Sequence, residues 1–171
     1  MLVAATTITG GARRSGSCVN GAQQLLVNAS GAMTFAGAVG GVTPLASVTT
    51  NAVGSTTIQG VTTTGAQIYN DPLITNGVYT TTGSGSVFTA NSTTTLAGAT
   101  SILTNSGNVL LNGTVNGANT LAINSGTGTI TFGTTVGATT PLTGLSVIST
   151  SPATFPHPAI PLPHPPTNGR Q

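Results

Sequence analysis

Few side chains of this sequence could carry out acid–base, nucleophilic or metal chemistry. Of the 171 residues, one is acidic, Asp71, and three are basic, Arg13, Arg14 and Arg170. Charged residues make up 2% of the chain, whereas an ordinary soluble domain is about 25% charged. Paired-carboxylate catalysis needs two acids, and acid-rich calcium sites or Walker-type phosphate sites need Glu or Lys, which the chain lacks. We therefore predict a protein that is not an enzyme and uses no cofactor.

The remaining candidate side chains each have an ordinary structural interpretation. His157 and His164 are the only imidazoles, and two ligands in a Pro-rich segment fall short of the four that a structural zinc site needs. Asp71 precedes Pro72, a pair that is typical of turns. Cys18 is the only cysteine, which excludes an internal disulfide. We thus predict no catalytic, cofactor-binding or metal-ligating residue.

The uncharged composition instead favours short β-strands joined by tight turns. Threonine supplies about a fifth of the chain, and its β-branched side chain suits a pleated, half-buried surface. Glycine and asparagine provide the positive-φ positions that tight turns need. No window of a dozen residues combines helix-forming residues with a helical apolar period. We therefore expect an all-β chain.

Twelve short apolar segments are strand candidates, and they recur about every ten residues, separated by Gly, Asn, Ser or Thr. They are Leu25–Val27, Met33–Phe35, Leu45–Val48, Thr57–Gln59, Gln67–Tyr69, Val78–Thr80, Ser86–Thr89, Thr95–Ala97, Ile102–Thr104, Asn108–Leu111, Leu121–Ile123 and Thr129–Phe132.

A longer internal repeat is also visible. Val19–Ala22 recurs as Val115–Ala118, at an offset of 96, and Met33–Phe35 recurs as Ile130–Phe132, at an offset of 97. One residue inserted in the intervening turn explains the change of offset. We interpret the match as a duplicated unit of about thirty residues, which predicts that Phe35 and Phe132 occupy equivalent inward positions. The other matching pairs are Leu26–Asn28 with Ala122–Asn124, Val39–Gly40 with Val136–Gly137, and Thr43–Leu45 with Thr140–Leu142.

Evenly spaced short strands are compatible with a sandwich, a barrel or a β-solenoid. The long repeat favours the solenoid, because each coil of a solenoid buries its apolar side only on its neighbours. Asn-Gly pairs at Asn76, Asn112 and Asn116 equally suit antiparallel hairpins, which remain the alternative. We predict one domain with three parts: an irregular lead over residues 1–18, a parallel β-solenoid over 19–150, and a disordered Pro/His-rich tail over 151–171.

Two segments resemble the repeats of large bacterial surface exoproteins. Residues 31–50 (GAMTFAGAVGGVTPLASVTT) and 61–71 (VTTTGAQIYND) are similar to repeats of filamentous-haemagglutinin-like adhesins and their β-strand-repeat relatives. The string Phe-x-Gly-x-Val-Gly-x-x-x-Pro-Leu, which begins at Phe35, carries most of the likeness. The resemblance covers residues 19–150 and implies a single-stranded right-handed parallel β-helix that is exported and displayed outside a bacterial cell. We expect the chain to be a fragment of such a repeat array.

These observations predict a non-enzymatic, extracellular structural or adhesive segment at the bacterial cell surface. Expected partners are neighbouring coils of the same or a longer chain, and host or environmental glycans. Nucleic acid is not expected, because three arginines near the ends form no basic patch. Membrane insertion is not expected either, because no apolar run has the length that a membrane-spanning helix needs. Open strand edges without a charged cap predict end-to-end self-association.

Three alternative functions stay open. The first is ice binding by the Thr-x-Thr pairs at residues 62–64, 80–82, 93–95 and 129–131, although their uneven spacing should prevent them from stacking in one row. The second is a glycan-processing β-solenoid, which would need the clustered acids or bases that the chain lacks. The third is an orphan fragment without a function of its own.

Overall fold

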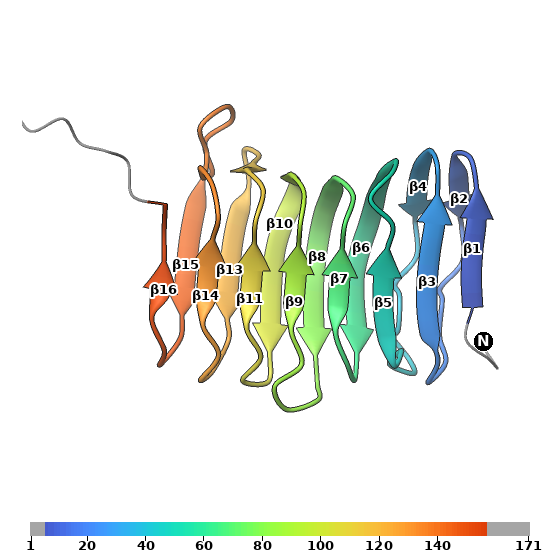
Figure 1. The fold of residues 1–171 in the computed structure, drawn as a ribbon, viewed down its shortest axis with the longest axis horizontal. Helices are drawn as coiled ribbons and strands as arrows, with labels where there is room; N and C mark the ends of the chain where they lie inside the picture. The colour runs from blue at the N-terminus through green and yellow to red at the C-terminus, as the bar shows by residue number, and fades with distance from the viewer. Residues whose placement is uncertain (1–5, 157–171) are drawn as a thin grey trace, which may run out of the picture.

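A computed structural model describes residues 6–156, which form two parallel β-sheets that face each other (Figure 1). Consecutive strands lie in opposite sheets, apart from β12 and β13, all the strand pairs are parallel, and no described residue is helical, so the β-solenoid is confirmed and the antiparallel alternative is wrong. Sheet A contains, in spatial order, β1 (Thr6–Gly10), β3 (Gln24–Ala29), β5 (Ser47–Thr50), β7 (Gln67–Tyr69), β9 (Phe88–Ala90), β11 (Val109–Leu111), β14 (Ile130–Phe132) and β16 (Ala153–Thr154). Sheet B contains β2 (Arg13–Ser15), β4 (Ala32–Phe35), β6 (Ser55–Thr63), β8 (Leu73–Thr81), β10 (Thr94–Thr104), β13 (Thr120–Asn124) and β15 (Gly144–Ile148), and the short β12 (Val115–Asn116) pairs with β10.

Each coil contributes one strand to each sheet, except that the coil of β11 contributes both β12 and β13 to sheet B. In sheet A, Phe88 pairs with Gln67 of the preceding coil and with Val109 of the following one. The strand candidates recur about every ten residues, which is about half a coil. The step from Phe88 to Val109 holds one more candidate than the step before it, because Thr95–Ala97 and Ile102–Thr104 both belong to β10. In Figure 1 the strands of sheet A point upward in front, those of sheet B point downward behind, and the chain advances from right to left. The winding is right-handed, as the resemblance implied and as parallel crossovers prefer.

The core lies between the two sheets, because successive strand side chains point to opposite faces. In β11, for example, Val109 and Leu111 are buried, whereas Leu110 between them faces outward. Phe35 and Phe132 are both buried, as the duplication predicted. The remaining large core residues stack in rows along the solenoid: Leu25, Val27, Met33, Val39, Leu45, Val48, Ile58, Val61, Tyr69, Leu73, Tyr79, Phe88, Leu96, Ile102, Val109, Leu111, Val115, Leu121, Ile123 and Ile130.

Equivalent strands of the two copies of the duplicated unit lie in opposite sheets. In the first copy β3 belongs to sheet A and β4 to sheet B, whereas in the second copy β13 belongs to sheet B and β14 to sheet A. From β3 to β11 there are four steps along sheet A, and β13 follows half a coil later, so the copies are four and a half coils apart. The exchange is possible because each coil consists of two similar strand-and-turn halves. The sequence repeat alone did not predict it.

The same turn opens both copies. The Asn20 side-chain oxygen accepts hydrogen bonds from the backbone N–H groups of Val42 (2.9 Å) and Thr43 (3.3 Å). In the second copy the Asn116 side-chain oxygen accepts from Thr139 (2.9 Å) and Thr140 (3.2 Å). Each asparagine thereby ties its own coil to the following one.

The coils extend beyond the limits that the sequence suggested. β1 and β2 fall within residues 1–18, expected to be an irregular lead, and both pair with strands of the next coil. Backbone pairing holds them there although their apolar pattern is weak. At the other end, β16 falls within the expected tail and pairs with β14, and Phe155 stacks on Phe132 with ring centroids 4.8 Å apart. The Pro/His-rich part from residue 157 onward lies outside the described residues.

Candidate functional site

The only acidic side chain, Asp71, lies in the turn between β7 and β8 and points into the interior, with 2% of its surface exposed. One carboxylate oxygen accepts a hydrogen bond from the Thr50 hydroxyl (2.5 Å) and the other accepts one from the Thr56 hydroxyl (2.7 Å). Burial raises the pKa of Asp71, and these hydroxyl hydrogen bonds oppose that rise. The turn position agrees with the sequence prediction, but the burial was not foreseen. Asp71 is placed to join β5, β6 and the turn before β8.

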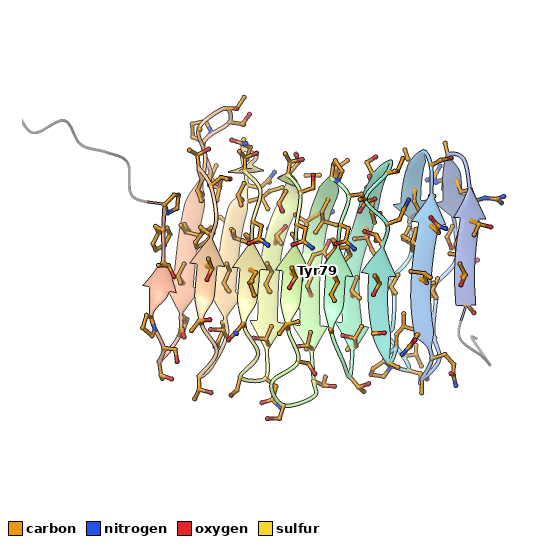
Figure 2. The ribbon with its side chains drawn as sticks, viewed as in Figure 1. Tyr79 is labelled. Atoms are coloured by element: carbon orange, nitrogen blue, oxygen red, sulfur yellow. The ribbon has the colours of Figure 1, made fainter. Side chains whose placement is uncertain are left out.

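An aromatic cluster lies close to Asp71. The rings of Tyr69, Tyr79 and Phe88 pack with centroid separations of 5.5 to 6.4 Å. Tyr79, labelled in Figure 2, comes from β8 and lies between the sheets, where its hydroxyl donates to the Ile58 carbonyl at 2.6 Å. The register between β6 and β8 shifts beyond this point, so the hydroxyl satisfies a carbonyl at an irregular part of the ladder. Burial raises the pKa of Tyr69 and of Tyr79, and both stay protonated at neutral pH.

A row of buried hydroxyls closes the turns that lead from sheet B to sheet A. Thr63, Thr81, Thr104 and Ser125 take equivalent places in successive coils. Each donates to a carbonyl of the turn that follows it, at 2.5 to 2.8 Å. These hydroxyls are therefore structural, because a buried polar group must be satisfied within the protein.

The outer face of sheet A carries the most regular array of polar side chains available to a ligand. At the centre of each strand one residue faces outward, and we call this line of residues the central row. Threonine alternates with an aliphatic residue along it, in the order Thr7, Leu26, Thr49, Ile68, Thr89, Leu110 and Thr131, followed by Thr154. Neighbouring strands lie about 4.8 Å apart, so the alternating hydroxyls recur at about 10 Å.

The strand register of sheet A is also more regular than that of sheet B. None of its recorded strand pairs shifts register, whereas sheet B shifts at β6 and again at β10. Bulges bend a strand and re-aim its side chains. Within residues 6–156 the central row runs through eight strands, whereas the outward row of sheet B that contains Ile74 runs in register through six, from Arg14 to Asn116.

A row of asparagines borders the central row, where the strands of sheet A end. The Asn91 amide donates to the Asn70 side-chain oxygen (2.7 Å), and the Asn112 amide donates to that of Asn91 (2.8 Å). The Asn70 amide donates to the Thr50 carbonyl (2.7 Å). Because each amide is engaged with the preceding coil, this row fixes the spacing of the coils beside the central row.

The other residues considered from the sequence do not converge on a site. Cys18 is an exposed free thiol, and Arg13 and Arg14 lie in β2. His157 and His164 fall outside the described residues. Residues 6–156 contain no group of three or more His, Cys, Asp or Glu side chains that could hold a metal ion. In the same range there is no helix of the length and apolarity required to cross a membrane.

The threonine clusters considered for ice binding are divided between the two sheets. Thr62 pairs with Thr80 in register in sheet B, so the expectation that uneven spacing prevents stacking was wrong for this pair. The coil between these two residues is shorter than the coil from Phe88 to Val109, and this brings the two clusters together. On the next coil Leu103 takes the equivalent place, and Thr131 lies in the other sheet.

Comparisons of the chain with protein-family models, with curated proteins and with solved structures found no match. The resemblance to surface adhesins therefore remains an expectation from the sequence. Sequence reasoning missed the central row, since its members come from different strands. The alternation becomes visible once residues that lie one coil apart are aligned.

Proposed function

We propose that the chain is a non-enzymatic structural and adhesive element whose ligand-binding surface is the outer face of sheet A. The observation that carries this proposal is the central row, where Thr49, Ile68, Thr89, Leu110 and Thr131 alternate between hydroxyl and aliphatic side chains. Neutral glycans have a matching chemistry, because each sugar unit presents hydroxyl groups and an apolar C–H face. A repeating polymer could meet this repeating row over several coils.

The interior supports a structural role over a catalytic one. Asp71 is enclosed by the Thr50 and Thr56 hydroxyls, and the Tyr79 hydroxyl is occupied by the Ile58 carbonyl. A general acid or base has to come within hydrogen-bond reach of its substrate. These groups instead hold one coil to the next.

A binding assay on immobilised neutral polysaccharides tests the proposal with a matched pair of variants. Ile68 and Ile74 both face outward and are partly exposed, but Ile68 lies in β7 of sheet A and Ile74 in β8 of sheet B. Ile68→Lys should weaken binding at least about tenfold, a loss of about 1.4 kcal/mol, whereas Ile74→Lys should leave it unchanged. Equal binding by both variants, at equal melting temperatures, would reject sheet A as the binding face.

Display outside a bacterial cell is the second part of the proposal, and it rests on the sequence resemblance. Labelling intact host cells with an antibody raised against the chain should give a surface signal without permeabilisation. A signal that appears only after permeabilisation would reject this location. That outcome would leave the polysaccharide-binding result unaffected, because the binding assay uses the isolated chain and not the host cell.

Ice binding is a weaker candidate on the same face. From Thr7 to Thr131 the central row places an aliphatic side chain between successive threonines, so the hydroxyls recur on alternate coils until Thr131 and Thr154. A measurement of thermal hysteresis on the full chain distinguishes the two functions. We expect no hysteresis, and a clear hysteresis gap that Ile74→Lys preserves and Thr89→Lys abolishes would favour ice binding over glycan binding.

A further inference from the structure

The amino-terminal end of the solenoid carries a charge at an inward position. β2 is the edge strand of sheet B, and its Arg13 pairs with Met33, a core residue. The Arg13 guanidinium lies against Gly10 at the corner between β1 and β2, 2.9 Å from where a Cβ of that glycine would stand. The Arg13 side chain is exposed at this end of the solenoid, and a charge on an edge strand discourages the addition of another strand. The sequence predicted open strand edges without a charged cap, and at this end the edge strand of sheet B carries Arg13 and Arg14.

The carboxyl-terminal end has apolar side chains at the corresponding positions. Within residues 6–156, β15 is the edge strand of sheet B and β16 that of sheet A. Leu145 and Val147 of β15 pair with buried residues of β13 and continue their rows, and Phe155 stacks on Phe132. The described residues include no further coil over them, so Leu145 is 42% exposed and Phe155 is 49% exposed.

We propose that this carboxyl-terminal end binds the same end of a second copy of the chain, which gives a closed, two-fold symmetric dimer. Leu145, Val147 and Phe155 supply the apolar contact. The edges of β15 and β16 that pair with no other described strand supply backbone N–H and C=O groups, which pair antiparallel across a two-fold axis. This inference does not depend on the proposed glycan binding, which uses a different face.

The charges of the described residues favour this pairing over the two other ways of joining ends, amino-terminal to amino-terminal and amino-terminal to carboxyl-terminal. Arg13 and Arg14 lie at the amino-terminal end, and Asp71 is buried in the middle coils. Joining two amino-terminal ends would bring four arginines together. Joining an amino-terminal to a carboxyl-terminal end would bury Arg13 against Leu145 and Val147 without a counter-charge, which is costly on general grounds. Two carboxyl-terminal ends bring only uncharged described residues into contact.

Symmetry then limits the size of the assembly. A contact in which the same surface serves both copies closes at the dimer, whereas a head-to-tail contact would continue into a filament. Sedimentation of the full chain from roughly 1 to 100 µM, a range suited to small interfaces, should show monomer converting to dimer with no larger species. A single monomer throughout, or an open series of larger species, would overturn the proposal.

Two leucines of equal exposure provide the matched test. Leu145 lies at the carboxyl-terminal end and is 42% exposed, whereas Leu26 lies in the central row of sheet A and is 41% exposed. Leu145→Lys should shift the monomer–dimer midpoint at least about tenfold to higher concentration, and Leu26→Lys should leave it unchanged. An equal effect of both substitutions would overturn the assignment of the interface to this end.

A gain of association tests the same idea without the risk of unfolding. Arg13→Leu removes the inward charge from the amino-terminal end and should allow species larger than the dimer. Unchanged sedimentation of this variant would overturn the role given to Arg13. Deleting residues 157–171 tests whether that segment, and not a second copy, occupies the carboxyl-terminal end. If the full chain stays monomeric and the shortened chain dimerises, the dimer proposal for the full chain is wrong.

Discussion

Two residues at the same place in the duplicated unit have very different surroundings. Val48 in the first copy and Leu145 in the second are separated by the offset of the repeat. Val48 is 1% exposed because β5 lies between β3 and β7, whereas Leu145 is 42% exposed because β15 has β13 as its one partner among the described strands. The sequence of the unit therefore determines which side chains point inward. Whether they are buried depends on the coil that follows.

The turns of the two copies, by contrast, are nearly identical. Gly40 and Gly137 have φ angles of 73° and 71°, and Gly21 and Gly117 have φ angles of 136° and 135°. Left-handed backbone of this kind favours glycine, which has no Cβ to collide with the neighbouring carbonyl. Local conformation is thus specified within each unit, and it survives the exchange of sheets between the copies.

The largest effect is expected from truncating the two phenylalanines of the repeat. Phe35→Ala should lower the free energy of unfolding by about 3–5 kcal/mol, because it leaves a cavity in a fully covered core. Phe132→Ala should cost less, because Phe155, stacked on it and half exposed, can move into the space. Urea unfolding of both variants measures the difference. A larger loss for Phe132→Ala would show that the end coil is more rigid than its exposure indicates.

The next effect concerns the two left-handed glycines. Gly137→Ala should cost about 1–2 kcal/mol from the backbone conformation alone, because its new Cβ would have only its own turn nearby, with Pro141 Cα at 3.3 Å. Gly40→Ala should cost clearly more, because its Cβ would collide with the Thr62 carbonyl of the next coil, which also accepts a hydrogen bond from Leu45. Thermal unfolding of the pair tests this ranking, and equal melting temperatures would contradict it.

A smaller effect is expected where the copies agree. Asn20→Ala and Asn116→Ala each remove the acceptor for two backbone N–H groups of the next coil. Both turns are largely exposed and water can replace the lost acceptor, so each substitution should cost about 1 kcal/mol. The two losses should match within error when unfolding is followed by circular dichroism. A loss confined to one copy would mean that the turns differ in a way that their hydrogen bonds do not reveal.

Much of the fold follows from local sequence, and the failures share one cause. The strand candidates overlap observed strands, because alternating apolar residues between Gly and Asn turns are sufficient to specify a strand. The sheet exchange, the early start at β1 and the inward place of Arg13 all depend on register between coils. Register is set by coil length, which is short where Thr56 pairs with Leu73 and considerably longer where Thr120 pairs with Gly144. The central row was missed for the same reason.

The region between the two copies contains Asp71, which has no counterpart in either copy, and its expected effect is the smallest and most specific. Burial raises the pKa of Asp71 above its ordinary value of 3.8. The folded state therefore holds this proton to higher pH than the unfolded state does, so stability should fall as the pH rises through 3.8 and level off above the folded-state pKa.

Asp71→Asn keeps the shape of the side chain and should remove this dependence. Asp71 is the only acidic side chain of the chain, so the difference between the unsubstituted protein and Asp71→Asn in urea unfolding between about pH 3 and pH 5.5, below the usual range of histidine titration, isolates its contribution from that of the terminal carboxyl group. If the stability of the unsubstituted protein instead rises with pH over this interval, then the Thr50 and Thr56 hydroxyls stabilise the charged carboxylate more than burial penalises it, and the electrostatic account of this site is reversed.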